Sequence, residues 1–375
     1  MHLISRYNVG MFDASTDAAF LRSILDDPDD DAPRLIYADW LDEQGDGDRA
    51  EFIRLQVRLF RISASHPDYK SMHERSYELS QPHHVEWVNR LPQFEHVHWE
   101  SFERGFISAV QFTEPDAFFQ HAGKILKAAP IQELRLHRFY WPEASRLGES
   151  KHLEGIRILD LNDGNRIANQ GTEGLMKSPY LRSLRSLKLG NNALGSTAVR
   201  AIAFAPYMRS LRELKLERND LYDDAVQFLA ASSNLVNLEE LDLDRTRTGD
   251  AGLKALATSR YLKSLRILNL SHNQITASGL ELLVQSPVVK HVSTMFLQMN
   301  RLGDRGAKAI AESPHLGSLV YLFLRSNNIG DDGAIALTNS PHLTSLRQLF
   351  IGENRISDLA ASGLRSAHGM GVNVS

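Results

Sequence analysis

The chain has 375 residues, 42 lysines and arginines, 46 aspartates and glutamates, and no cysteine. The lack of cysteine excludes disulfides, thiolate nucleophiles and cysteine-bound zinc or iron–sulfur clusters. No stretch reaches the roughly 20 consecutive apolar residues of a membrane span, and no lysine- or arginine-rich tract provides the basic footprint of a nucleic-acid-binding protein. We therefore expect neither a membrane nor a nucleic acid as a partner.

Residues 1–10 lack the charged start, long apolar stretch and small-residue cleavage site of a secretory signal. Met11 is an alternative start of the chain. Together with the absence of cysteine, these features favour a cytoplasmic protein.

Residues 12–60 predict a module of three short helices, because apolar residues recur there at helical spacing. The three apolar stripes are Phe20, Leu21, Ile24 and Leu25; Leu35, Ile36, Trp40 and Leu41; and Phe52, Ile53, Gln56, Leu59 and Phe60. Pro33 suits the start of the second helix and Gly45 its end.

The same module is acidic, with eleven carboxylates between Asp26 and Glu51 and only two arginines, Arg34 and Arg49. The run 26–31 lacks the alternating ligands, central glycine and closing glutamate of a calcium-binding EF-hand loop, so we expect a solvated loop. Asp39, beside Trp40, is either a functional acid or half of an ion pair with an arginine such as Arg34 or Arg49. We favour the ion pair.

Two runs in this module, RLIYADWLDEQGD at 34–46 and RAEFIRLQ at 49–56, resemble the bacterial repeat-companion domain. That domain is found at the head of proteins that continue into repeat arrays. The resemblance implies an architecture, and it implies no activity and no catalytic residues.

Residues 61–130 are expected to form an adaptor and a cap that includes the first, atypical repeat. A helix is predicted from His66 to Leu91, and the first irregular strands are predicted around Trp99, Phe102, Arg104, Gly105, Phe106 and Ile107. A repeat array needs such a cap, because its terminal turn would otherwise leave an apolar face and a strand edge in water.

Four histidines in this region raise the alternative of a metal-binding or enzymatic N-terminal part. They are His83, His84, His96 and His98, with Glu95 and Glu100 close in sequence. Adjacent histidines on a helix diverge by about 100 degrees, and nothing in the spacing relates one pair to the other. We therefore expect no metal ligand here.

From residue 131 to 375 the sequence repeats every 27 residues. Seven registers open the pattern L-x-x-L-x-L-x-x-N-x-L at Leu184, Leu211, Leu238, Leu265, Val292, Leu319 and Leu346. The asparagine position reads Asn192, Asn219, Thr246, Asn273, Asn300, Asn327 and Asn354. Degenerate copies begin at Ile156, with one extra residue before Asn165, at Ile131 and at Ile107.

This pattern has a direct structural interpretation. The alternation in L-x-L predicts a short strand with two buried leucines, and the asparagine is expected to satisfy backbone groups where the chain bends. Segments such as 303–314 predict a helix in each turn, which a Ser-Pro pair then ends, as at Pro314. We expect Leu268, Leu270, Leu322 and Leu324 to be buried.

The motif resembles the leucine-rich-repeat family over residues 107 to 375, and most closely its ribonuclease-inhibitor-like subclass. The resemblance implies an α/β solenoid, a horseshoe with parallel strands on the concave face and helices on the convex face. It also implies a scaffold that binds another protein on the concave face. The last residues, 361–375, are expected to form a frayed partial turn.

Three columns of outward-pointing strand residues line the concave face. The central column is Lys188, Lys215, Asp242, Asn269, Phe296, Phe323 and Phe350. Two residues earlier the column is Ser186, Glu213, Glu240, Ile267, Thr294, Tyr321 and Gln348, and two residues later it is Gly190, Glu217, Asp244, Ser271, Gln298, Arg325 and Gly352. The first half is a mosaic of charges, and the second half is an aromatic ladder.

We predict that a protein partner contacts both halves. The expected anchors are Phe296, Phe323, Phe350, Tyr321, Arg325, Ile267 and Met299, and the expected charged contacts are Lys188, Lys215, Glu213, Glu217, Asp242 and Asp244. Contiguous exposed apolar residues commonly mark interaction sites. In the alternative, the rings only stabilise the array by stacking and the charges only keep it soluble.

The sequence contains no phosphate-binding loop, dinucleotide fingerprint, nucleophile elbow or zinc-hydrolase motif. We therefore expect neither an enzyme nor a cofactor. A third hypothesis is a self-associating structural protein that forms a homodimer through the aromatic ladder.

Overall fold

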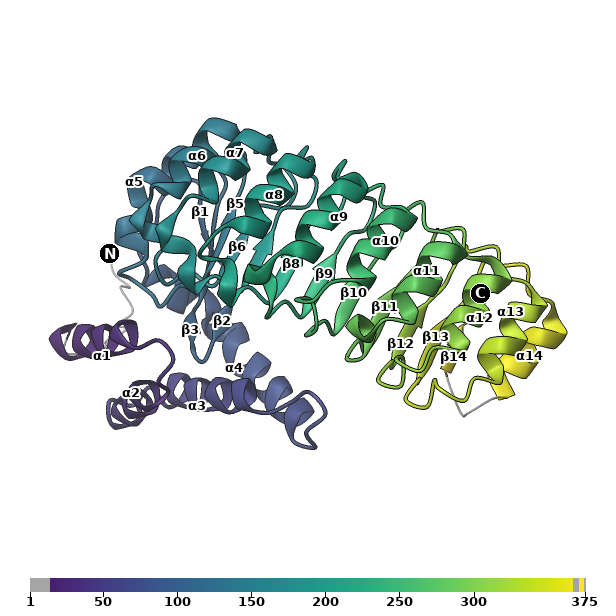
Figure 1. Cartoon of the computed structure of the whole chain (residues 1–375). Helices are drawn as coiled ribbons and strands as arrows, with labels where there is room; N and C mark the ends of the chain where they lie inside the picture. The colour runs from purple at the N-terminus through teal and green to yellow at the C-terminus, as the bar shows by residue number, and fades with distance from the viewer. Residues whose placement is uncertain (1–13, 367–370, 374–375) are drawn as a thin grey trace, which may run out of the picture. The chain divides into compact units, whose positions relative to one another are not determined.

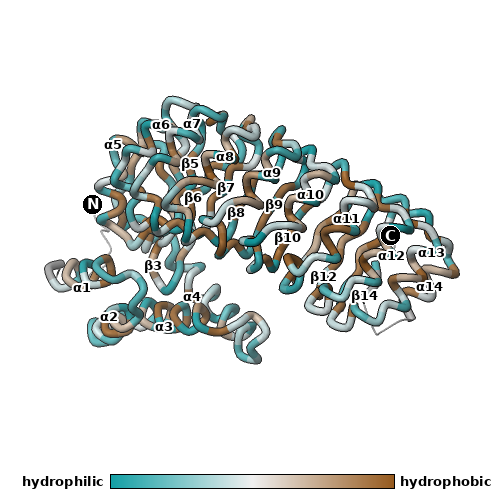
Figure 2. Tube along the Cα trace, in the orientation of Figure 1, coloured by the Kyte–Doolittle hydropathy of each residue, from teal (hydrophilic) through white to brown (hydrophobic). Residues whose placement is uncertain are grey.

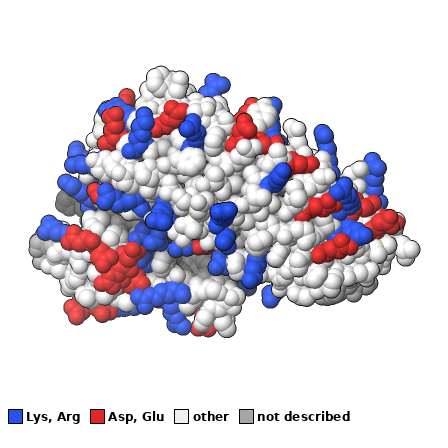
Figure 3. All heavy atoms as spheres, viewed as in Figure 1, with Lys and Arg blue, Asp and Glu red and all other residues white. Residues whose placement is uncertain are grey.

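The computed structural model describes residues 14–366 and 371–373, so Met11 lies outside the described residues. The chain divides into two compact units, residues 1–135 and 136–375. Figure 3 shows lysines and arginines interspersed with aspartates and glutamates over the face that is drawn. Among the described residues, no helix has the length and apolar character needed to cross a bilayer.

The first unit begins with four helices, α1 (Ala14–Asp26), α2 (Ala32–Glu43), α3 (Gly47–Arg61) and α4 (Tyr69–Asn89). The predicted helices of residues 12–60 and 66–91 are confirmed within the described residues. The unit continues with β1 (Val97–Trp99), β2 (Phe102–Glu103), β3 (Phe106–Ile107), β4 (Ala109–Phe112), α5 (Pro115–Ile125) and β5 (Glu133–Leu136). Strand β4 pairs antiparallel with β1, and β2 pairs antiparallel with β3.

One apolar cluster joins the β3 hairpin to the first three helices. Ile24, Leu41, Ile53 and Phe106 are buried in it. The hairpin approaches α3 so closely that a Cβ on Gly105 would lie 2.8 Å from the Cα of Ile53. Gly105 also has a positive φ of 85°, so this position requires glycine for two reasons.

Two members of the predicted apolar stripes are exposed instead. Ile36 is 56% exposed, because it follows the buried Arg34 by two residues and so lies on the opposite side of α2. Phe60 is 53% exposed, and its ring covers the guanidinium of Arg104 at 4.5 Å. The stripe prediction was wrong at these positions because charged side chains occupy the core beside them.

Buried arginines hold the loops of this unit together. Arg34 donates to the Asp30 carbonyl at 2.8 Å, and Arg49 donates to the Gly105 carbonyl at 2.6 Å with the Trp87 ring 4.3 Å away. Both guanidinium groups therefore have hydrogen-bond partners other than Asp39. The expected ion pair of Asp39 with an arginine is confirmed, but the partner is Arg54, at 2.6 Å, and not Arg34 or Arg49.

The acidic run 26–31 is only partly the solvated loop that was expected. The buried Asp31 carboxylate accepts from Arg61 at 2.8 Å and from Arg104 at 3.3 Å. Asp30 accepts from the Ala32 N–H at 2.9 Å, at the start of α2. The run thus anchors a helix start and a buried arginine.

The second unit alternates strands with helices (Figure 1). Its strands are β6 (Ile158–Asp160), β7 (Ser186–Lys188), β8 (Glu213–Lys215), β9 (Glu240–Asp242), β10 (Ile267–Asn269), β11 (Thr294–Phe296), β12 (Tyr321–Phe323), β13 (Gln348–Phe350) and β14 (Gly371–Asn373). Its helices are α6 (Trp141–Gly148), α7 (Ala168–Leu175), α8 (Ser196–Phe204), α9 (Tyr222–Ala231), α10 (Asp250–Ala257), α11 (Ala277–Val284), α12 (Gly303–Ala311), α13 (Asp331–Thr338) and α14 (Asp358–Ser366).

Strands β6 to β14 pair in parallel and in chain order. Leu241, Leu268, Met295 and Leu322 lie side by side in successive strands, as the repeat of 27 residues predicts. Leu268, Leu270, Leu322 and Leu324 are fully buried, which confirms their prediction. In Figure 2 hydrophobic segments recur along the strands and helices, separated by hydrophilic connections.

The end of the chain differs from the expected frayed turn. Residues 358–366 form α14, and β14 pairs in parallel with β13 through Gln348 and Gly371. The prediction was wrong for these residues because the backbone of Gly371–Asn373 adds a strand without the leucines of the motif.

An asparagine connects most repeats to the one before it, and Thr246 occupies this position once. The Asn273 amide donates to the carbonyls of Leu243, Leu270 and Ser271 at 2.7, 3.1 and 2.9 Å, while its oxygen accepts the N–H groups of Thr246 and Thr248 at 3.1 and 2.9 Å. Asn327 likewise donates to the Leu297 carbonyl at 2.8 Å. The expected role of these asparagines is confirmed.

A serine forms a second connection at the ends of α9 to α13. Ser259, Ser286 and Ser340 donate their hydroxyls to carbonyls of the preceding repeat, those of Ala230, Ala257 and Ala311, at 2.7, 2.6 and 2.6 Å. Ser232 and Ser313 donate to Ala203 and Val284 in the same way. The Ser-Pro pair was predicted only to stop the helix, but its serine also connects two repeats.

An aspartate in the first turn of several helices caps the next helix along the array. Asp223 accepts from the N–H groups of Gly249 and Gly252 at 2.7 and 2.9 Å, and Asp304 accepts from Gly330 at 2.6 Å. A carboxylate is favourable at the positive end of a helix dipole. These repeats therefore orient the helix that follows.

The asparagine ladder yields a stability prediction. Replacing Asn273 by Ala leaves several buried backbone groups unpaired, at about 1–3 kcal/mol for each such group, so we expect a loss of more than about 3 kcal/mol. Asn273→Thr should cost less, because Thr246 occupies the same position and still donates to the Leu243 carbonyl at 2.8 Å. Urea unfolding curves measure both; an Ala variant as stable as the Thr variant would contradict this role.

Candidate functional site

The outward side chains of β6 to β13 form what we call the strand face. The strand pairing aligns the seven members of the predicted central column, Lys188, Lys215, Asp242, Asn269, Phe296, Phe323 and Phe350, in one row. The side chains that differ between repeats are thus brought together in space, although they are 27 residues apart in sequence.

Three phenylalanines in this row form an aromatic strip. The ring centroids of Phe296 and Phe323 are 4.4 Å apart with planes at 17°, and those of Phe323 and Phe350 are 4.4 Å apart and parallel. All three are partly exposed. Asn269 precedes the strip in the row and Asn373 follows it, so polar residues bound the strip at both ends.

The other predicted anchors differ in how exposed they are and in whether they form an ion pair. Tyr321 is 40% exposed and lies on the same strand as Phe323, and Met299 is 49% exposed in the bend after β11. Ile267 is partly buried on β10. Arg325 is held in an ion pair with Glu353, whose other oxygen accepts from the Ser326 hydroxyl at 2.6 Å.

The bend that carries Met299 has a feature that the repeat pattern did not reveal. Met299 has a positive φ of 55°, and the equivalent residues also have φ near this value: Asn191, Arg218, Arg245, His272, Ser326 and Glu353. None of them is glycine, although positive φ is uncommon for other residues. Each bend therefore projects a side chain in the same fixed backbone conformation along one edge of the strand face.

The charged half of the strand face is a network of ion pairs. Lys215 Nζ lies 2.9 Å from Glu213 and 3.2 Å from Glu240, and Lys188 lies 3.6 Å from Asp160. Asp242 accepts from the Asn269 amide at 3.0 Å. Asp244 contacts the His272 ring at 2.7 Å. The predicted charged residues are therefore adjacent, with acids in excess.

Burial and pairing shift the pKa values of this network in different directions. Burial raises the pKa of Glu217 and of Asp242. Burial also opposes the charge of Glu213, but the neighbouring Lys215 ammonium and Ser186 hydroxyl outweigh it and lower the pKa of Glu213. Burial opposes the charge of Lys215 as well, but the bonds to Glu213 and Glu240 raise its pKa overall.

Two residues of the network were missed from the sequence. Asp160 pairs with Lys188, while Asn162 accepts from the Gly190 N–H at 2.6 Å and donates to Glu217 at 3.2 Å. They lie in the copy with one extra residue before Asn165, so the columns were not extended to them. The alternation of Leu159 and Leu161 is the signal that could have placed them.

The family comparison agrees with the repeated strands and helices of the second unit. A family model described as Leucine Rich repeat matches residues 180–203, 234–257, 261–284, 297–311 and 316–337. These segments of the chain are leucine-rich repeats. A crystal structure of an internalin (inlF) from Listeria monocytogenes is 18% identical, covers 70% of this chain and 71% of that chain, and has a TM-score of 0.45. No curated protein matches the chain.

The histidines before the leucine-rich repeats have separate environments. His83 lies 3.1 Å from Asp48 and stacks on Trp87, and His84 meets the Phe102 ring edge-on. His96 lies 3.4 Å from Glu95, and His98 is exposed on β1. Within residues 14–366 and 371–373, no three side chains of histidine, aspartate or glutamate converge as a metal site would require.

Glu217 provides a test of the charged network. One of its oxygens, Oε2, is buried and has no hydrogen-bond partner among the described residues. Because its pKa is raised in the folded state, ionised Glu217 destabilises the fold above that pKa, and the penalty vanishes below the unfolded pKa, near 4.5. We expect Glu217→Gln to raise the denaturation midpoint at pH 7 and to leave it unchanged near pH 3.5. Equal effects at both pH values would contradict this reading.

Proposed function

We propose that the leucine-rich repeats are a non-catalytic scaffold that holds another protein against the strand face. Arrays of this family typically bind proteins, and the aromatic strip is the observation that carries the proposal. Stacking between its rings contributes about 0.5–1.5 kcal/mol per pair, which explains part of the arrangement. Stacking covers ring faces, however, and leaves the ring edges in water.

The neighbours of the strip extend this exposed surface. Tyr321 and Met299 add two half-exposed side chains, so exposed apolar side chains gather into a patch on β11 to β13 and the bend after β11. Such patches mark interaction sites, and aromatic residues are the ones that most often carry binding energy. We infer that Phe296, Phe323 and Phe350 anchor the partner.

The charged half of the strand face would orient that partner. Lys188 and Lys215 each pair with acids that the array already contains, and the remaining carboxylates, including Glu217, Asp242 and Asp244, leave the region acidic. Charges at the edge of an interface act mainly on the association rate and on the register of binding. We therefore infer a partner that is basic where it meets β7 to β10 and apolar where it meets β11 to β13.

We assign the parts of the chain in the same way. Residues 12–60 are proposed as the repeat-companion domain, 61–130 as adaptor and cap, and 131–375 as a solenoid of the ribonuclease-inhibitor-like subclass. The antiparallel pairing of β1 with β4 supports the cap, and the helix in each 27-residue repeat supports the subclass. We assign no reaction to any of these parts.

The proposal predicts that Phe323→Ser abolishes partner capture. Removing a central aromatic anchor should weaken binding by about 2 kcal/mol or more. The loss of two stacking contacts should also lower the unfolding free energy by about 1–3 kcal/mol, so binding must be measured at a temperature where the variant is folded. Proteins captured from the native lysate by wild type and by the variant give the measurement.

A matched control is Leu359→Ser, which removes an apolar side chain that is 84% exposed on α14. It should leave capture unchanged. If Phe323→Ser retains every captured protein, the strip only stabilises the array. If the captured protein is a second copy of the chain, the strip is a homodimer contact, which light scattering after gel filtration would show.

A further inference from the structure

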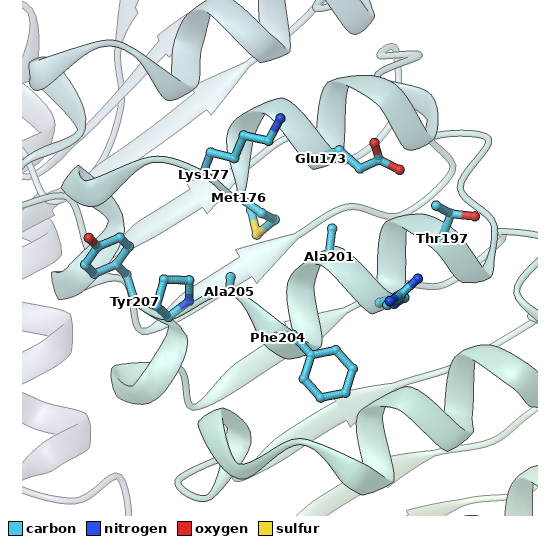
Figure 4. A pocket seen from close by; sticks show the side chains of 10 residues that line it. Glu173, Met176, Lys177, Thr197, Ala201, Phe204, Ala205 and Tyr207 are labelled. Carbon is cyan, nitrogen blue, oxygen red and sulfur yellow. The ribbon is translucent and has the colours of Figure 1, made fainter.

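An open cleft lies between α7 and α8, among the helices of the second unit (Figure 4). Its volume is about 810 Å³. Met176 and Ala201 contribute apolar surface, and Phe204 and Tyr207 stand at its sides, 51% and 37% exposed. Clefts that bind ligands have volumes of this order and are mostly apolar.

The cleft coincides with two departures from the repeat. Where Ser232, Ser259, Ser286, Ser313 and Ser340 donate to the preceding repeat, this repeat has Ala205. The Met176 carbonyl therefore receives no hydroxyl from that position, and both residues line the cleft. The adjacent Phe204 is also exceptional, because the equivalent residues are Lys177, Ala231, Thr258, Gln285, Glu312 and Asn339.

Charged side chains line the same cleft. Lys177 and Arg200 are exposed, and neither forms an ion pair among the described residues; the Arg200 guanidinium lies 6.0 Å from the Phe228 ring. Glu173 is the one carboxylate in the lining. The cleft thus combines an apolar floor with two cationic side chains and one carboxylate, so its lining has a net positive charge. This combination suits a ligand that is apolar in one part and negatively charged in another.

We propose that this cleft docks a peptide segment of another protein in which a large apolar side chain stands next to carboxylates. The apolar side chain lies on Met176 and Ala201 and against Phe204, and the carboxylates meet Lys177 and Arg200. The open sides and the exposed rings suit a segment of a protein better than an enclosed small molecule. The site is separate from the strand face, so it does not depend on the function proposed there.

Three labelled peptides test this proposal. Each is a fluorescein-labelled dodecapeptide of glycine and serine that carries Phe-Asp-Asp, Phe-Lys-Lys or Ala-Asp-Asp at its centre, and fluorescence anisotropy measures binding to the full chain. The Phe-Asp-Asp peptide should bind at least tenfold more tightly than the other two. Equal affinity for the acidic and basic peptides, or no saturation by any of them at millimolar protein, would overturn the proposal.

Variants of the full chain separate the apolar and ionic parts of the site. Ala201→Trp should fill the cleft and weaken binding of the Phe-Asp-Asp peptide at least tenfold. Lys177→Glu combined with Arg200→Glu changes only exposed side chains and should reverse the preference to Phe-Lys-Lys. Phe323→Ser, on the strand face, should leave all three affinities unchanged. Binding that survives both cleft changes, or that is lost with Phe323→Ser at a temperature where this variant is folded, would show that the peptide binds elsewhere.

Discussion

The asparagine amide found in all but one of the seven regular bends, where Thr246 stands instead, is the interaction on which the rest of this structure depends. Asn273 pairs with carbonyls of its own bend, with the Leu243 carbonyl of the preceding repeat, and with two N–H groups of that repeat. A bend of this kind contains backbone groups that neither the strand nor the helix can satisfy, and leaving them unpaired is costly. One side chain satisfies them and sets the register between neighbouring repeats at the same time.

Because the register is fixed, equivalent side chains of successive repeats align in columns, and the differences within these columns form the candidate binding surfaces. Because the leucines, asparagines and helix-end serines hold each repeat against the next, the remaining positions can differ while the fold is kept. Two such differences form surfaces: the phenylalanines of the aromatic strip, and the pair Phe204 and Ala205 beside the cleft between α7 and α8. Both are read as deviations from an otherwise regular pattern, which is why a repeat protein is informative about its binding sites.

The features that recur in every repeat could be predicted from the sequence. The leucine and asparagine positions, the 27-residue register and the row of phenylalanines follow from periodicity, since identical local interactions recur in every repeat. Side-chain pairs that occur only once could not be predicted from periodicity. The ion pairs of Asp39 with Arg54 and of Arg325 with Glu353 are examples, because such pairs depend on rotamers and on the packing of separate elements. Strand β14 was missed because its backbone pairs without any leucine, and Asp160 because an insertion interrupts the pattern.

Site-specific photo-cross-linking tests the central claim most directly, since it reports which face of the repeats the partner touches. A benzophenone amino acid would replace Phe350 at the end of the strip or, as the comparison, Ile335, which is 51% exposed on α13. The proposed function predicts that irradiation in the native lysate joins a protein to the chain at position 350 and not at position 335. Cross-links at position 335 alone would contradict it, and would place the partner on the helices.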